Sequence, residues 1–183
     1  MFVTGDTLVH SAGDLALASR CEYALLRTLD ANLGRIETEQ GDDAMFARLA
    51  RLGSQHEARE LLRLKREHPD GVVTIERPAE SIPSELAAAA RATLAAAQQR
   101  VPVIYQGTFF DGEFLGFSDF LIHDPSTDTY AVYDTKLSRT ERVPSVLQIA
   151  AYADALEAVG VPTSPTGHLV LGDGADHAVH LPD

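Results

Sequence analysis

Two apolar segments in the second half of the chain contain charged residues where a buried strand would carry hydrophobic side chains. The first segment, Gly-Phe-Ser-Asp-Phe-Leu-Ile, covers residues 116–122 and has Asp119 at its centre. The second, Tyr-Ala-Val-Tyr, covers residues 130–133 and is followed by Asp134 and, two residues later, by Lys136. Charged groups rarely lie in such segments without partners. The sequence therefore predicts a sheet that brings these charges together.

The connection between the two segments predicts how they pair. Asp-Pro-Ser-Thr-Asp, residues 124–128, has turn-forming composition, so we expect an antiparallel hairpin. Asp134 and Lys136 are two residues apart, so their side chains should lie on one face of an extended strand. The hairpin would bring Asp119 close to Asp134. Two carboxylates and one amine would then face a common point.

This combination of groups is suited to phosphodiester hydrolysis. Mg²⁺ prefers carboxylate oxygens and is usually held by one or two carboxylates together with substrate phosphate. Such a metal stabilises charge on a scissile phosphate and lowers the pKa of a bound water, and a nearby lysine can orient that water. The alternative for Asp134 and Lys136 is a same-face ion pair on a half-exposed strand.

A helix predicted from about residue 144 to 159 carries the next candidates. Gln148 and Tyr152 are four residues apart and should share one helical face. The amide can hydrogen-bond to a phosphate, and the ring can pack against a sugar or base. An ordinary polar and aromatic pair between helix and sheet is the alternative.

A second long helix, predicted from Asp42-Asp43 to about His68, places a histidine on its apolar face. The buried line is predicted to pass through Met45, Leu49, Leu52 and His56. A histidine in this position is more often a satisfied core residue than a ligand. The neighbouring Glu57 is about 100° away around the helix and is expected to point elsewhere.

The remaining elements are predicted from caps, turns and apolar periodicity. Ser-Ala-Gly-Asp, residues 11–14, has the pattern of a capping box and should open a helix that ends at Gly34, with Cys21 buried on its apolar stripe. Tyr105 and Gln106 are assigned to core and edge. The other predicted elements are a helix that starts at Ser81 or Ser84 and ends near 99, and strands at 72–76, 101–110, 113–122 and 167–172.

Length and composition predict a single domain over residues 1–183 in a cytoplasmic protein. The chain has 45% hydrophobic and 23% charged residues, and no segment suits a signal peptide or a membrane span. The single cysteine excludes an internal disulfide. A net charge of −12 argues against a large nonspecific DNA-binding face, because such binding depends on phosphate neutralisation by Lys and Arg.

The ordered set of Asp119, Asp134-Thr-Lys136 and Gln148-x-x-x-Tyr152 resembles the RecB-like branch of the PD-(D/E)XK nucleases. The proline that precedes the first aspartate in that signature is Ser118 here. The resemblance covers about residues 5–172. It implies an α/β domain of the restriction-endonuclease-like fold, with three α/β/α layers and a central mixed sheet.

The resemblance also implies a function and a set of roles. The chain would be a metal-dependent DNA nuclease, exonucleolytic on single-stranded ends in DNA repair or recombination, with a helicase domain or subunit as partner and no membrane association. Mg²⁺ or Mn²⁺ would be bound by Asp119, Asp134 and His56, since Gly53-x-x-His56 matches the family's N-terminal histidine. Lys136 would assist the attacking water, while Gln148 and Tyr152 would bind the substrate.

Relatives of this kind often bind a 4Fe-4S cluster through one early and three late cysteines. Cys21 matches the first, and the other three are absent from these residues. We therefore expect the sequence to be the N-terminal part of a longer nuclease and helicase fusion, with a cluster only in the longer chain. The rival hypothesis is a catalytically inactive nuclease-fold module with a structural or DNA-guiding role in a helicase complex.

Overall fold

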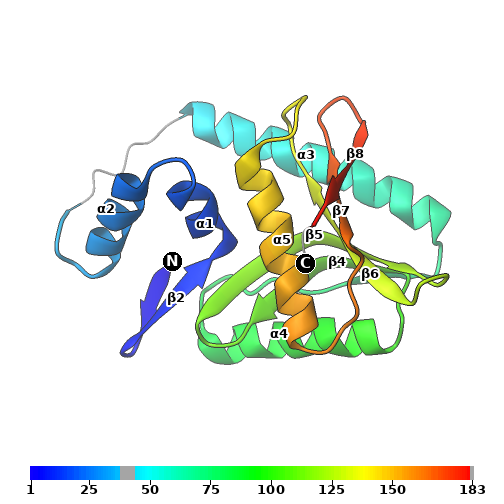
Figure 1. Ribbon diagram of the computed structural model, residues 1–183, viewed down its shortest axis with the longest axis horizontal. Helices are drawn as coiled ribbons and strands as arrows, with labels where there is room; N and C mark the ends of the chain where they lie inside the picture. The colour runs from blue at the N-terminus through cyan, green and yellow to red at the C-terminus, as the bar shows by residue number, and fades with distance from the viewer. Residues whose placement is uncertain (38–43, 182–183) are drawn as a thin grey trace.

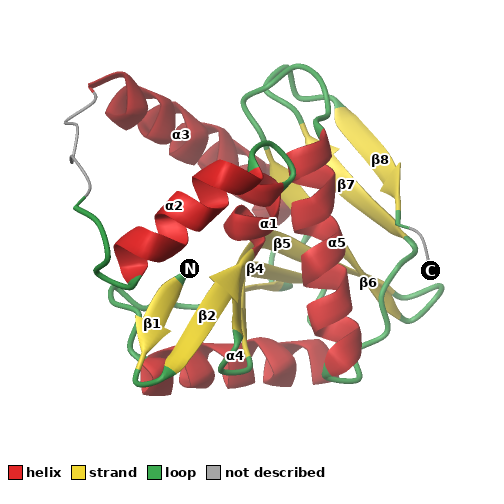
Figure 2. Cartoon of the chain, turned by 60° about the vertical axis from the view of Figure 1, so that its left-hand side comes forward, coloured by secondary structure: helices red, strands yellow, loops and turns green. Residues whose placement is uncertain are grey.

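The computed structural model describes residues 1–37 and 44–181, which form a mixed α/β structure with eight strands and five helices (Figures 1 and 2). The strands are β1 (Phe2–Thr4), β2 (Thr7–Ser11), β3 (Val72–Thr74), β4 (Val103–Phe110), β5 (Phe114–Asp124), β6 (Thr129–Thr135), β7 (Thr166–Val170) and β8 (Asp176–His180). The helices are α1 (Ala12–Ala18), α2 (Glu22–Asn32), α3 (Ala44–Glu67), α4 (Pro83–Gln98) and α5 (Val143–Ala158).

The sheet is mixed and is organised around the long strand β5. Antiparallel pairs are β1–β2, β4–β5, β5–β6 and β7–β8, whereas β2–β5, β3–β4 and β6–β7 are parallel. One edge of β5 pairs with β4 along its length. The other edge pairs with β2 only at residues 114–115 and with β6 only at residues 120–124. In the described register, residues 116–119 therefore have no strand partner on that edge.

Helices cover both faces of the sheet. Neighbouring strand residues point to opposite faces, and in the central strands both faces carry apolar side chains that need covering. Ile104, Leu121 and Val132 pack with residues of α4 and α5. Their neighbours Val103, Phe120 and Tyr133 pack with Leu64 of α3 on the opposite face. Figure 1 shows α5 in front of the sheet and α3 behind it.

The N-terminal strands form a hairpin that the sequence analysis missed. Thr4 pairs with Thr7 across the two-residue turn Gly5-Asp6, in which Gly5 has a φ of 57°. A Gly-Asp pair between two short β-prone segments is a hairpin signal. The hairpin matters for the site because β2 leads into α1 through Ser11, whose side chain accepts from the Asp14 N–H in the predicted capping box.

The predicted mixed α/β class, the mixed sheet and the hairpin between β5 and β6 are confirmed. Two N-terminal predictions are wrong. The first helix is interrupted between α1 and α2, and Cys21 is exposed at the start of α2 instead of buried. None of the described residues of α2 is buried, so the apolar stripe of this helix, on which the predicted burial of Cys21 rested, does not pack into the core. The predicted start of the second helix at Asp42-Asp43 lies outside the described residues.

The C-terminal prediction was also incomplete, because β8 follows β7 after the turn around Gly174. None of the helices in the described ranges combines the length and the apolar content that crossing a bilayer requires.

Two glycines near the unpaired part of β5 should respond oppositely to substitution by alanine. A Cβ at Gly116 would lie 2.6 Å from Cε1 of the buried Tyr152, whereas a Cβ at Gly53 in α3 would meet no atom within 4 Å. We expect Gly116→Ala to lower the free energy of unfolding by about 1–3 kcal/mol through overpacking. Gly53→Ala should raise it by up to about 1 kcal/mol through helix propensity. Urea denaturation of both variants measures this, and equal effects would contradict the packing described.

Candidate active site

A hollow of about 560 Å³ opens beside the unpaired residues of β5. Its walls come from β2 and α1 on one side, α3 on another, and β5, β6 and α5 at its base. All the sequence-predicted site residues except His56 line it: Asp119, Asp134, Lys136, Gln148 and Tyr152. A second cavity, of about 460 Å³ between α4 and α5, is mainly apolar and lies away from these groups.

Asp119 is held by the neighbouring strand. Its Oδ2 accepts hydrogen bonds from the Thr135 backbone N–H at 2.7 Å and from the Thr135 hydroxyl at 2.6 Å. Both bonds connect Thr135 of β6 to Asp119, the unpaired residue of β5 that lies next to the Phe120–Tyr133 pair. They replace the backbone hydrogen bonds that continued strand pairing would make. They fix the carboxylate through one oxygen at the edge of the hollow.

Asp134 is the most deeply buried charged group of the site, with 3% of its surface exposed. Lys136 forms an ion pair with its Oδ2 from the same strand face, as the two-residue spacing predicted. The ion pair does not supply a well-directed hydrogen bond, and Asp134 Oδ2 receives none from the described residues. The partner of this oxygen is therefore the Lys136 amine, which a cation bound at Asp134 would have to displace.

Burial raises the pKa of Asp134 to about 7, against the lowering effect of the Lys136 charge. The nearby negative charge of Asp119 acts in the same direction as burial. Between the ordinary pKa of 3.8 and the raised value of about 7, the folded protein therefore holds a proton on Asp134 that the unfolded chain would release.

Gln148 and Tyr152 share one face of α5, as predicted. Gln148 Nε2 donates a hydrogen bond to the Tyr152 hydroxyl at 3.3 Å. The Tyr152 ring is buried, stacks on Phe109 with centroids 5.5 Å apart and lies directly over Gly116. The ring is therefore committed to packing in this structure, although both residues line the hollow.

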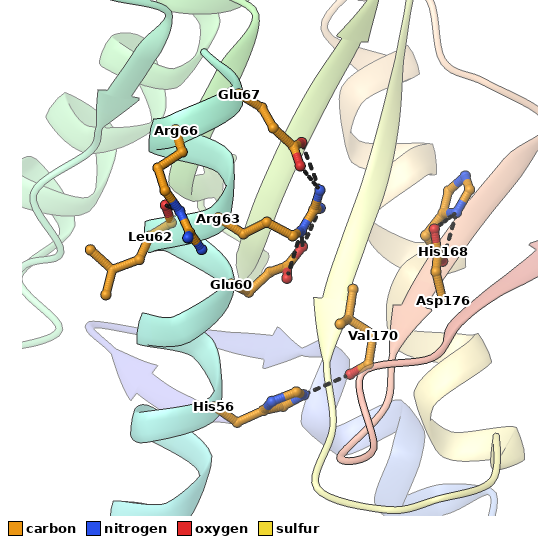
Figure 3. A network of polar contacts seen from close by, with 9 residues as sticks. All are labelled: His56, Glu60, Leu62, Arg63, Arg66, Glu67, His168, Val170 and Asp176. Atoms are coloured by element: carbon orange, nitrogen blue, oxygen red, sulfur yellow. Dashed lines mark hydrogen bonds and ion pairs between the residues drawn. The ribbon is translucent and has the colours of Figure 1, made fainter. Parts of the chain in front are cut away.

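His56 is buried, as predicted, but the rest of the predicted buried line is wrong, because Met45, Leu49 and Leu52 are exposed. His56 also lies outside the lining of the hollow. Its Nε2 is 3.0 Å from the carbonyl oxygen of Val170 on β7 (Figure 3). Further along the same helix, Arg63 is ion-paired with Glu60 and Glu67 (Figure 3), which explains why this charged face carries no site chemistry. The role of His56 as a metal ligand stays a prediction.

Glu57 takes the place in the hollow that the sequence analysis gave to His56. It lines the hollow from α3 and points in a different direction from His56, as their spacing on the helix predicted, but the assignment of the site direction to His56 instead of Glu57 is not what the structure shows. Burial and the neighbouring charge of Asp119 raise the pKa of Glu57. Gln106 Nε2 donates to Glu57 Oε1 at 2.5 Å, so Gln106 also belongs to the site and not merely to the strand edge. The sequence offered one signal for Glu57, namely that it directly follows the candidate ligand His56. A modest rotation of the helix decides which of two neighbouring residues faces the hollow.

Arg77 is a second functional candidate that the sequence analysis did not single out. Its guanidinium lies 3.8 Å from the centre of the Phe117 ring, and both residues line the hollow. Its charge lowers the pKa of Glu57, opposing the effects of burial and Asp119. An arginine guanidinium can bind a phosphate while it contacts an aromatic ring, so Arg77 is a candidate phosphate ligand.

The donor set fits a hard divalent cation, although it is not a preformed site. No three His, Cys, Asp or Glu side chains in the described ranges are arranged as a group that could hold a metal ion. The three carboxylates of Asp119, Asp134 and Glu57 nevertheless line one hollow, and Asp134 Oδ2 lacks a directed hydrogen bond. Oxygen donors of this kind suit Mg²⁺ or Mn²⁺.

A scan of the chain against protein-family models finds no match, and a search of curated proteins finds no relative. A functional assignment therefore depends on the groups in the hollow.

The raised pKa of Asp134 predicts a pH dependence of stability in metal-free buffer. The folded-state pKa of about 7 exceeds the ordinary value of 3.8, so the contribution of this group is present below pH 4 and is lost as pH rises toward 7. Asp134→Asn removes this loss. We expect the stability of the variant relative to wild type to increase between pH 4 and 7 by at most about 1.4 kcal/mol per pH unit. Urea denaturation in EDTA at several pH values measures the difference, and parallel profiles would contradict it.

Proposed function

We propose that the protein is a metal-dependent nuclease that hydrolyses DNA phosphodiester bonds, acting exonucleolytically on single-stranded ends during repair or recombination. The observation that carries the proposal is the buried Asp134 carboxylate, ion-paired with Lys136, in a hollow that also contains Asp119. Paired carboxylates next to an amine are the groups that phosphodiester hydrolysis needs.

The roles of the residues follow from their places in the hollow. Asp119, Asp134 and Glu57 would hold Mg²⁺ or Mn²⁺, which when bound supplies positive charge to the scissile phosphate and acidifies water. Lys136 would leave Asp134 and orient the attacking water. The water oxygen would form a new P–O bond and release one proton to solvent, the P–O bond to the leaving strand would break, and the leaving oxygen would take one proton from solvent. Gln148 would donate to a phosphate oxygen.

We also infer that the sheet and its helices belong to the restriction-endonuclease-like fold of the PD-(D/E)XK nucleases. Helices on both faces of a mixed sheet support this inference. So does the placement of Asp119 and Asp134 on the paired strands β5 and β6, with Lys136 directly after β6, beside the part of β5 that has no strand partner. A 4Fe-4S cluster, with Cys21 as one ligand, remains a prediction for a longer chain.

A second candidate function is a catalytically inactive module that guides DNA or supports a helicase partner. The ion pair between Lys136 and Asp134 favours the inactive module, because the lysine neutralises the most buried carboxylate of the site without a metal ion. The net charge of −12 favours it as well. Cleavage activity separates the two functions, whereas metal binding alone does not.

The nuclease is tested with single-stranded DNA labelled at either end, incubated with Mn²⁺ or Mg²⁺. We expect metal-dependent shortening from one end, and a loss of rate of roughly 100-fold or more in Asp119→Asn and Lys136→Ala, because charge stabilisation in the transition state is removed. The product ladder reports polarity.

Asp70→Asn is a matched control, since Asp70 is exposed and does not line the hollow. Cleavage that survives unchanged in Asp119→Asn would point to a contaminant. Absence of cleavage by wild type with both metals would favour the inactive module.

Arg77 is expected to contact a phosphate next to the scissile one. Arg77→Ala should weaken binding of a single strand several-fold and reduce the slope of log K against log salt by about 0.7, the value for one phosphate contact. Arg77→Lys should retain most of the slope because the charge remains. Fluorescence anisotropy in metal-free buffer measures both. Arg66→Ala, on the exposed part of α3, is the control, and an equal loss there would show that only overall charge matters.

A further inference from the structure

Strand β4 contains a backbone conformation that a strand does not require. Gln106 has a φ of 61° between the regular pairs Tyr105–Phe120 and Gly107–Ser118. The other described non-glycine residues with positive φ are Arg100, just after α4, and Asp128, in the turn between β5 and β6. Such conformations are ordinary at helix ends and turns. Within a strand, a glutamine in this region is strained and persists only where its surroundings compensate.

The strained backbone changes the face of the sheet that the Gln106 side chain reaches. Strand alternation would place Gln106 with Ile104, which packs in the cluster formed by α4 and α5. Its amide instead donates to Glu57 on α3, which covers the opposite face with Tyr105. The positive φ is therefore coupled to the 2.5 Å hydrogen bond between Gln106 Nε2 and Glu57 Oε1.

A neutral amide is a suitable partner for a carboxylate that must remain able to bind a cation. A lysine or arginine would neutralise Glu57, as Lys136 does Asp134. The Gln106 amide fixes one Glu57 oxygen, which limits the rotation of the carboxylate and leaves its negative charge in place. Glu57 is half-buried and lines the hollow with Asp119 and Asp134, so its direction decides whether three carboxylates can act on one ion.

We propose that Gln106 is a positioning residue that holds Glu57 in the direction required for a third carboxylate ligand, and that the strain in β4 is retained for this purpose. The inference rests on the proposed metal-dependent function. It adds a partner that orients Glu57 beside the hydroxyl of Tyr105, which also hydrogen-bonds this carboxylate, and it gives a reason for the strained strand residue.

Two substitutions separate positioning from a purely structural role. Gln106→Gly removes the amide and also relieves the strain, because glycine adopts positive φ freely. Gln106→Asn keeps an amide and tolerates positive φ, but its side chain is one methylene too short to reach Glu57 in the same way. Gln55→Ala is the control, since Gln55 is an exposed amide on the same helix as Glu57 and does not line the hollow.

The experiment combines thermal unfolding in EDTA with calorimetric titration of Mn²⁺. We expect Gln106→Gly to raise the unfolding temperature of the metal-free protein and yet to weaken Mn²⁺ binding by 10–100-fold, the usual effect of losing a partner that orients a ligand. Gln106→Asn should weaken Mn²⁺ binding to a similar extent, and Gln55→Ala should leave it unchanged. In cleavage assays, kcat at fixed Mn²⁺ should fall while KM for DNA stays constant.

Wild-type Mn²⁺ affinity in both Gln106 variants would overturn the positioning role, whatever their unfolding temperatures. In that case a wild-type protein that binds Mn²⁺ and cleaves DNA would leave the proposed function standing. A wild-type protein that neither binds Mn²⁺ nor cleaves DNA would overturn the proposed function and the positioning role together.

Discussion

The change of partner along one edge of β5 is the constraint on which the hollow depends. β2 pairs with the beginning of β5 and β6 with its end, so four residues between them have a free edge in the described register. Asp119 lies in this interval, and its carboxylate takes the backbone N–H of Thr135 as a substitute for strand pairing. β2 can diverge there because its chain turns into α1 at the Ser11 capping box. Ordinary capping and packing thus create an opening in an otherwise continuous sheet.

The same opening concentrates charge that the protein must balance. Three carboxylates line the hollow, and the cations among its lining side chains are Lys136 and Arg77. Burial raises the pKa of Asp134 to about 7, so near neutral pH a proton, the Lys136 amine and a divalent cation would compete for one carboxylate. In the proposed enzyme this competition is useful, because a cation that displaces Lys136 also releases the amine to act on water.

Local rules predicted the parts of the site that depend on local geometry. The two-residue spacing of Asp134 and Lys136 and the four-residue spacing of Gln148 and Tyr152 place each pair on one face of a strand or helix, and the structure shows this. The choice between His56 and Glu57 could not be made this way, because it depends on how α3 is rotated against the sheet.

Some features needed information beyond the patterns used. The positive φ of Gln106 has no pattern in the neighbouring sequence, and the hydrogen-bond partner of its side chain lies 49 positions away. The hairpin at Gly5-Asp6 did have a local signal, and there the turn chemistry was overlooked.

The acidic composition is compatible with a nuclease if DNA in the hollow interacts mainly with the charged groups close to it. At physiological ionic strength, exposed charges more than about 8 Å apart are largely screened from one another. A strand end in the hollow would therefore respond mainly to Arg77, Lys136 and the carboxylates that line it, and weakly to acidic groups on distant helices. The net charge would instead reduce the rate at which DNA is captured from solution. If the proposed enzyme acts on DNA, a partner with a basic surface would raise this capture rate by delivering the strand, and the proposed helicase partner would be suited to that role.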